Sequence, residues 1–121
     1  MRRCLVVDDS RVIRTIACRI LEEFEITGEQ AEDGESALQA CRKDMPDLLL
    51  LDGDAPGLNS AEFVRTLRRE KGGDKPLVVY CVTEIDVPHI SQVLHAGANH
   101  YILKPYDRIA MRNRLADLGL A

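Results

Sequence analysis

The sequence lacks the features that mark several large classes of protein. Its 121 residues contain no apolar run close to the roughly 20 residues that a membrane span needs. Residues 1–3 lead directly into an apolar stretch, without the hydrophobic region and cleavage site of a secretory signal. Acidic residues outnumber basic ones by 20 to 16, whereas nucleic-acid modules are usually basic. We therefore expect a single-domain cytoplasmic protein that binds neither membrane nor nucleic acid.

Cysteine and histidine are too scattered for a zinc site. The four cysteines include no Cys-x-x-Cys pair, and each lies in or beside an apolar segment, so we expect small buried hydrophobic residues. The three histidines are not spaced as zinc ligands and are expected at the surface. These residues are Cys4, Cys18, Cys41, Cys81, His89, His95 and His100.

A regular alternation of apolar runs and helical patterns fills the chain. Near-continuous apolar runs predict buried parallel strands at residues 4–7, 48–51, 77–82 and 101–103, with a weaker edge strand at 29–31. Apolar residues at helical spacing predict helices at about 12–24, 35–42, 61–69, 85–96 and 107–118. Five β-α units in strict alternation predict an α/β fold, a doubly wound five-stranded parallel sheet with helices on both faces.

Residues that commonly bound helices support these limits. Ser10, Asn59 or Ser60, and Asp107 are placed to cap helix N-termini, and Gly97 follows the fourth helix. The first helix is expected to bury an apolar stripe of Val12, Ile13, Ile16, Ala17, Ile20 and Phe24.

Polar residues close the apolar runs. Asp8 and Asp9 follow the first run, and Asp52 closes the run at 48–51. Thr83 ends the next run, and Lys104 ends the last. Because parallel strands end at one edge of an open α/β sheet, where such folds carry their sites, we expect these side chains to meet.

This residue set suits a divalent cation and a phosphoryl group. Magnesium takes carboxylate oxygens together with water and phosphate oxygens, which Asp8, Asp9 and Asp52 can complement. Without a cation, the three carboxylates would repel one another, and at least one is expected to stay protonated. Lys104 and Thr83 would then contact a phosphoryl group on Asp52, and its reversible attachment would make a switch.

With these residues in place, the chain resembles the receiver domain of two-component response regulators. The likeness is to the CheY-like type and extends over residues 3–118. The segments VVDDS at 6–10, LLD at 50–52 with Pro56 after it, VT at 82–83 and LKP at 103–105 carry it. Residues 96–99 and 104–107 are similar to chemotaxis-type receivers. The resemblance implies a flavodoxin-like strand order of 2-1-3-4-5.

The resemblance also implies a function. Asp52 would accept a phosphoryl group from a histidine kinase or phosphotransfer protein, with Mg²⁺ as cofactor. Asp8, Asp9, Asp52 and the backbone carbonyl of Asp54 would hold the metal, while Thr83 and Lys104 would contact the phosphoryl group. The chain would not be an enzyme in the usual sense, since it would catalyse only phosphotransfer to Asp52 and slow dephosphorylation there.

Output is expected through protein binding. No effector domain is expected in residues 1–121, so the chain is interpreted as a stand-alone, monomeric receiver. The face between Ile85 and Leu118 would bind a downstream protein. Tyr101 occupies the position of the aromatic residue that turns inward on activation. The direction of Lys104 could be fixed by a cis peptide bond to Pro105, since X-Pro bonds adopt that form most readily.

Two positions depart from the family pattern. Asn59-Ser60 stands where an Asp-Gly step is usual, and Ser60 lacks the freedom of glycine at positive φ, so a reshaped turn is predicted. Asp54, two residues after the phosphoacceptor, is expected to alter the lifetime of the phosphoryl bond.

Three other readings compete with the phosphorylated switch. A receiver that binds its partner independently of phosphorylation is one, because of the changed Asn59-Ser60 step. Asp52-Gly53-Asp54 also matches the Asp-x-Asp motif of haloacid-dehalogenase-like phosphatases. Those enzymes carry the motif after their first strand and usually have a cap insertion, whereas here it follows the third strand and the chain has no room for a cap. A nucleotide-binding protein of flavodoxin type would need a glycine-rich loop after the first strand, where Asp8 and Asp9 stand instead.

Overall fold

The computed structural model describes residues 2–55 and 58–121, in which five strands alternate with five helices. Pro56, part of the predicted phosphoacceptor motif, lies outside the described residues. In chain order the elements are β1 (Arg2–Val7), α1 (Arg11–Glu22), β2 (Ile26–Ala31), α2 (Gly34–Lys43), β3 (Leu48–Asp52), α3 (Ser60–Arg69), β4 (Leu77–Val82), α4 (Val87–Ala96), β5 (His100–Leu103) and α5 (Arg108–Asp117). The predicted alternation of strands and helices is confirmed.

The strands form one parallel sheet in the order β2-β1-β3-β4-β5, as the resemblance implied. The predicted edge strand is β2, which is longer than expected. Strands β1 and β3 are neighbours, and Val7 pairs with Leu51 in their register. This pairing brings the residues that follow them, Asp8 and Asp52, to the same edge of the sheet.

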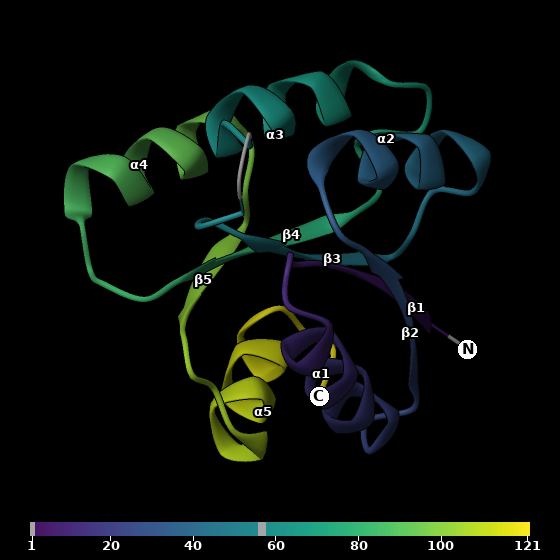
Figure 1. Cartoon of the computed structure of the whole chain (residues 1–121), viewed down its shortest axis with the longest axis vertical. Coiled ribbons are helices and arrows are strands. Elements are labelled where there is room, and N and C mark those ends of the chain that lie inside the picture. The colour runs from purple at the N-terminus through teal and green to yellow at the C-terminus, as the bar shows by residue number, and fades with distance from the viewer. Residues whose placement is uncertain (1, 56–57) are drawn as a thin grey trace.

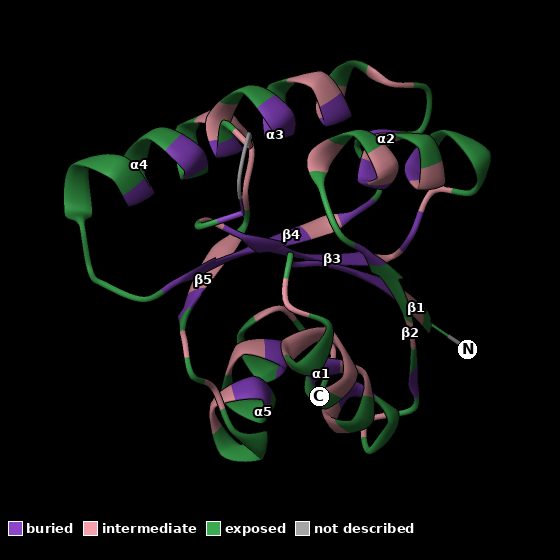
Figure 2. Cartoon of the chain, viewed as in Figure 1, coloured by how far each residue is buried: buried purple, intermediate pink, exposed green. Residues whose placement is uncertain are grey.

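Helices cover both faces of the sheet. Helices α2, α3 and α4 lie on one face, and α1 and α5 lie on the other (Figure 1). The sheet between them is buried over most of its length (Figure 2). Each face has its own apolar cluster, and burying a leucine or valine side chain in such a cluster stabilises the fold by about 1.5–3 kcal/mol.

The predicted burial of cysteine is confirmed for Cys4, Cys41 and Cys81, while Cys18 is half-buried. No helix among the described residues is both long and apolar enough to cross a bilayer.

Side-chain caps set the helix limits. Ser10, Asn59 and Asp107 cap α1, α3 and α5, as predicted. Helix α4 begins at Val87, two residues later than predicted, because Asp86 caps it by accepting a hydrogen bond from the backbone N–H of His89. Proline in the first helical turn is compatible with this start, since its missing N–H has no intrahelical partner there.

The predicted stripe on α1 is partly wrong. Ala17 and Leu21 are fully buried, but Val12 is 66% exposed and Ile16 is 44% exposed. The face of α1 that packs on the sheet is narrower than the stripe formed by its apolar residues. Val12 and Ile16, one turn apart, therefore remain on the surface.

The reshaped turn predicted at Asn59-Ser60 stays a prediction, because residues 56–57 of the loop before it lie outside the described residues. Ser60 is the first residue of α3 and is helical, so it has no need of positive φ. Among the described residues, only Glu25 is a non-glycine residue with positive φ. Asn59 supplies the cap through its side-chain oxygen, which accepts from the backbone N–H of Glu62 at 3.0 Å.

Arg68 links the C-terminal end of α3 to the C-terminal end of α4. Its guanidinium donates to the carbonyl of Gly97, which ends α4, at 3.1 and 2.8 Å. It also donates to the carbonyls of Gly73 and Pro76 and to the side-chain oxygen of Asn99. Charged hydrogen bonds of this kind are among the stronger ones in proteins, so this corner of the fold is held firmly.

We expect Asn59→Ala to lower the free energy of unfolding by about 1 kcal/mol, because it removes the α3 cap. Asn59→Asp should stay close to the wild type, since aspartate caps equally well. Urea unfolding at neutral pH measures both. An Asn59→Ala variant as stable as Asn59→Asp would contradict the cap assignment.

Candidate phosphoryl-acceptor and metal site

The polar residues predicted to meet do so at one edge of the sheet. Asp8 and Asp9 follow β1, Asp52 closes β3, Thr83 follows β4, and Lys104 follows β5. Backbone hydrogen bonds continue past the strand ends, since the N–H of Asp8 donates to Ala31 and that of Lys104 donates to Val82. The sheet therefore fixes where each of these side chains begins.

Lys104 lies between two buried carboxylates. Its Nζ donates to Asp52 Oδ1 at 2.9 Å and to Asp8 Oδ2 at 3.0 Å. Burial acts to lower the pKa of Lys104, but its hydrogen bonds to Asp52 and Asp8 raise it above its usual value. The lysine is therefore a fixed positive charge. The peptide bond between Lys104 and Pro105 is cis, as expected.

Asp52 is the most enclosed carboxylate of the site, with 2% of its surface exposed. Its Oδ1 also accepts a hydrogen bond from the backbone N–H of Asp54 at 3.0 Å. Burial raises the pKa of Asp52, even though the Asp54 amide and Lys104 act to lower it. The expected upward shift is thus present, but its main cause is burial, and repulsion from Asp8 adds less.

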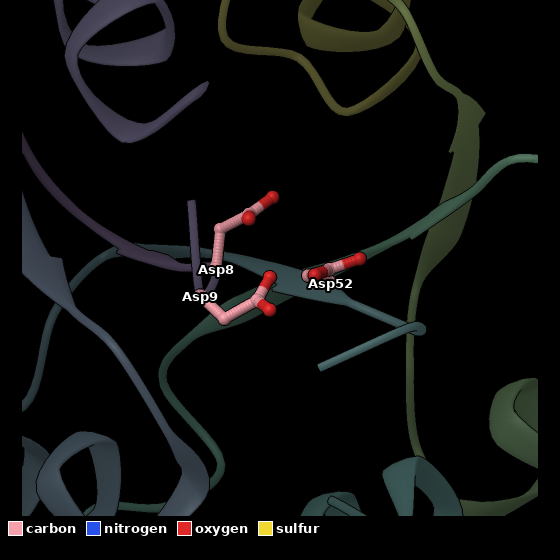
Figure 3. Close-up of side chains that lie close together, drawn as sticks. All are labelled: Asp8, Asp9 and Asp52. Atoms are coloured by element: carbon pink, nitrogen blue, oxygen red, sulfur yellow. The ribbon is translucent and has the colours of Figure 1, made fainter. Parts of the chain in front are cut away.

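Asp8, Asp9 and Asp52 form a group that could hold a metal ion. One carboxylate oxygen from each lies within 4.8 Å of the others. Figure 3 shows the three side chains gathered where β1 and β3 end. Asp8 and Asp52 are buried and Asp9 is exposed, so a cation held there would keep a solvent-facing side. Oxygen ligands with room for water match the preference of magnesium.

The chain orients Asp8 before any ligand binds. Its Oδ1 accepts from the backbone N–H of Ser10 at 2.9 Å. Its backbone carbonyl accepts from the guanidinium of Arg14 at 2.7 Å. Asp8 is thus part of the turn into α1, although Ser10 and not Asp8 caps that helix.

Thr83 lies at the site and hydrogen-bonds to the side chain of Asp54. Its Oγ1 donates to Asp54 Oδ2 at 3.2 Å, and both residues are exposed. The carboxylate of Asp54 is outside the three-carboxylate group. The expected role of Asp54 as a metal ligand concerned its backbone carbonyl, and that role stays a prediction.

Tyr101, the predicted switching aromatic residue, is half-buried on β5. Its ring lies 5.4 Å from the guanidinium of Arg114, whose Nε donates to the Tyr101 carbonyl at 2.6 Å. In the sheet register Tyr101 is the partner of Tyr80 on β4.

One contact near the site was missed from the sequence. His89 and His95 are exposed as predicted, but the Nε2 of His89 reaches the hydroxyl of Tyr80 at 2.6 Å. His100 is half-buried and lies 3.3 Å from a carboxylate oxygen of Asp117. A tyrosine within an otherwise apolar, buried strand was the available signal, because a buried phenol needs a polar partner.

Comparison with known proteins agrees with this geometry. Residues 4–116 match the family model described as the response regulator receiver domain. The chain is 36% identical over 106 residues to the phosphate regulon transcriptional regulatory protein PhoB of Escherichia coli, covering 87% of this chain and 46% of PhoB. It is 33% identical over 116 residues to the CAI-1 autoinducer sensor kinase/phosphatase CqsS of Vibrio cholerae, covering 95% of this chain and 17% of CqsS. The chain thus spans less than half the length of these relatives.

Solved structures give the same assignment. The chemotaxis response regulator CheY4 of Vibrio cholerae superposes with a TM-score of 0.90 at 25% identity, with 98% of each chain covered. A response regulator receiver domain from Bermanella marisrubri superposes with a TM-score of 0.84 at 30% identity, with 97% of each chain covered. The chain belongs to the response regulator receiver domain family, and its fold is the CheY-like, flavodoxin-like one. This assignment replaces the phosphatase and nucleotide-binding alternatives.

Asp52 should make stability depend on pH. Folding raises the pKa of Asp52. Its favourable contribution to the free energy of unfolding is therefore fully present below the unfolded-state pKa of about 3.9, and it is lost as the pH rises through the folded-state pKa. Asp52→Asn stays neutral at every pH and can still accept the same hydrogen bonds. Without metal, we expect it to be more stable than the wild type at pH 7, with a difference that shrinks towards pH 4. Urea unfolding with a chelator at several pH values measures this, and a difference independent of pH would contradict it.

Proposed function

We propose that this chain is a single-domain response regulator of two-component signalling in which Asp52 is the phosphorylated residue. The observation that carries the proposal is the arrangement around Asp52. Its carboxylate is buried, the ammonium group of Lys104 donates a hydrogen bond to it, and Asp8 and Asp9 lie beside it. In this family, receiver domains take phosphoryl groups from histidine kinases or phosphotransfer proteins, and we assign that partner class here.

In the proposed reaction, a carboxylate oxygen of Asp52 attacks the phosphorus of a phosphohistidine. The O–P bond forms, the N–P bond breaks, and the imidazole leaves with the electron pair. Lys104 is placed to donate to the transferred phosphoryl oxygens, and Thr83 can exchange its hydrogen bond to Asp54 for one to the same group. These new contacts distinguish the phosphorylated from the free protein, which a switch requires.

We assign Mg²⁺ as the cofactor. Asp8, Asp9 and Asp52 would hold it, with the backbone carbonyl of Asp54 as a further ligand. When bound, the metal would offset the negative charge of the carboxylates and of the incoming phosphoryl group. A solved receiver domain of the sensor histidine kinase PA1611 of Pseudomonas aeruginosa holds a magnesium ion in its active-site cleft, on the same fold at 22% identity.

An exposed apolar surface beside the site suits a protein phosphodonor. A small groove is lined by Ile13, Ile16, Lys104 and Pro105, and Val12, one turn before Ile16, is 66% exposed. Exposed apolar residues next to a reactive group commonly mark a contact surface. We assign this surface to the histidine-bearing partner, because a donor must approach Asp52 from this edge of the sheet.

Output is assigned to the face between Ile85 and Leu118, which binds a downstream protein. Ile85, Val87 and Leu103 expose apolar side chains there. We propose that the chain acts alone and as a monomer in the cytoplasm, and that its only catalytic work is its own phosphorylation and dephosphorylation. The alternative of phosphorylation-independent binding, which rests on the changed Asn59-Ser60 step, stays the second candidate, and treatment with a phosphodonor distinguishes the two.

A small-molecule phosphodonor tests the proposal. Acetyl phosphate with Mg²⁺ should phosphorylate the wild type and the control Asp74→Asn, whose aspartate lies in the exposed loop after α3. Asp52→Asn and chelation of Mg²⁺ should each abolish the modification, as measured by mass spectrometry of the intact protein. No adduct, or one that survives Asp52→Asn, would overturn phosphorylation at Asp52 and favour phosphorylation-independent binding.

Asp54 should shorten the life of the phosphoryl group. Among the described residues, Thr83 donates the one side-chain hydrogen bond that the exposed carboxylate of Asp54 accepts. The carboxylate can therefore accept a proton from a water molecule that attacks phosphorus. That attack breaks the O–P bond and releases phosphate. We expect Asp54→Asn to lengthen the half-life several-fold in a phosphate-release assay. An unchanged rate would remove this role while leaving the assignment of Asp52 intact.

A further inference from the structure

Tyr80 carries a hydroxyl group into an otherwise apolar part of the protein. It lies on β4, is only 1% exposed, and belongs to the apolar cluster under α2, α3 and α4. In the sheet register it is the partner of Leu51, the residue directly before Asp52. A buried phenol is costly unless its hydroxyl is hydrogen-bonded, so its partners indicate what it holds in place.

Two different helices contribute residues beside the hydroxyl of Tyr80. The Nε2 of His89, in the first turn of α4, lies 2.6 Å from the tyrosine oxygen. The Ser60 side chain, at the start of α3, lies on the α3 side of the phenol and acts to lower the pKa of Tyr80, which burial raises. With the His89 ring proton on Nδ1, Tyr80 donates to Nε2. The phenol thus lies between the ends of α3 and α4 that are nearest the site and is hydrogen-bonded to α4.

The same hydroxyl touches the chain next to Asp52. A Cβ added at Gly53 would lie 2.7 Å from the Tyr80 oxygen, so the backbone approaches the phenol as closely as glycine allows. Gly53 is fixed there by its N–H, which donates to Cys81 at 2.8 Å. The next residue, Asp54, donates its own N–H to Asp52. A movement of the backbone at Asp52 or Asp54 therefore meets the Tyr80 hydroxyl.

There is also space for the contact to change. Gly53, Asp54, Tyr80, Thr83 and His89 all line one cavity of about 160 Å³ between the loops that follow β3 and β4. His89 is exposed. The hydrogen bond between Tyr80 and His89 can therefore break without repacking the apolar cluster.

We infer that Tyr80 and His89 form a hydrogen-bonded bridge that couples the backbone at Asp52 to the first turn of α4. The inference rests on the proposed function, because the signal it carries is phosphorylation of Asp52. Tyr80 and His89 are positioning residues, since neither touches the reacting carboxylate.

Amide hydrogen exchange of α4 tests the bridge in the free protein. Tyr80→Phe keeps the ring and removes the hydroxyl, and we expect it to speed exchange of amides 90–93 about two- to tenfold, the range of one net hydrogen bond. His89→Ala should have the same effect. The double variant should exchange no faster than either single variant if both act through one bond. His95→Ala, an exposed histidine in the last turn of α4, is the matched control and should leave these amides unchanged.

The coupling is tested with beryllium fluoride and Mg²⁺ as a phosphoryl mimic. In the wild type, the mimic should shift the amide resonances of Asp54 and Thr83 and change exchange at amides 90–93. In Tyr80→Phe, the first effect should remain and the second should be lost. Mimic binding with an α4 response equal to that of the wild type would overturn the bridge alone. No binding of the mimic to the wild type would overturn the proposed function and the coupling with it.

Additive effects of Tyr80→Phe and His89→Ala in the free protein would also overturn the bridge, because they would show two independent contacts.

Discussion

The ammonium group of Lys104 is the contact on which the rest of the site depends. It joins Asp8 and Asp52, which lie 96 and 52 residues away in sequence, and it does so at the ends of three different strands. Without it, two buried carboxylates would face each other with no compensating charge, which is strongly unfavourable in a region poorly accessible to water. The same positive charge is where an incoming phosphoryl group needs it. Folding and the proposed chemistry therefore place the same demand on this residue.

The parts of the site that follow from topology could be predicted from the sequence. Apolar runs ending in Asp8, Asp52 and Lys104 were enough, because parallel strands deliver their last residues to a common edge. The choice among hydrogen-bond partners could not be predicted in the same way. Thr83 donates to Asp54, and that choice depends on distances of a few tenths of an ångström that no sequence pattern encodes.

The same distinction applies to the fold. The expected strand order and layers agree with the structure, whereas the predicted buried stripe of α1 does not, because part of it is exposed. A helical period identifies which residues share a stripe, but the width of the buried face depends on how the helix lies on the sheet. The start of α4 was missed for a local reason, because two acidic residues, Glu84 and Asp86, precede it and only one caps it. Asn59-Ser60 departs from the motif, yet Asn59 has a defined partner in the backbone N–H of Glu62, and Ser60 begins α3.

Helix α4 is held very differently at its two ends. Arg68 binds the carbonyl of Gly97 at the C-terminal end with two charge-assisted hydrogen bonds, while the loop before Val87 is exposed. A helix that is fixed at one end moves by pivoting about that end. Any displacement of this helix is therefore smallest beside Arg68 and grows towards Val87, so a small local change would be enlarged along about ten residues before it reached a binding partner. The fixed point of such a motion is set by where the Arg68 side chain is anchored, and the Tyr80–His89 contact lies at the opposite end, where the displacement is largest.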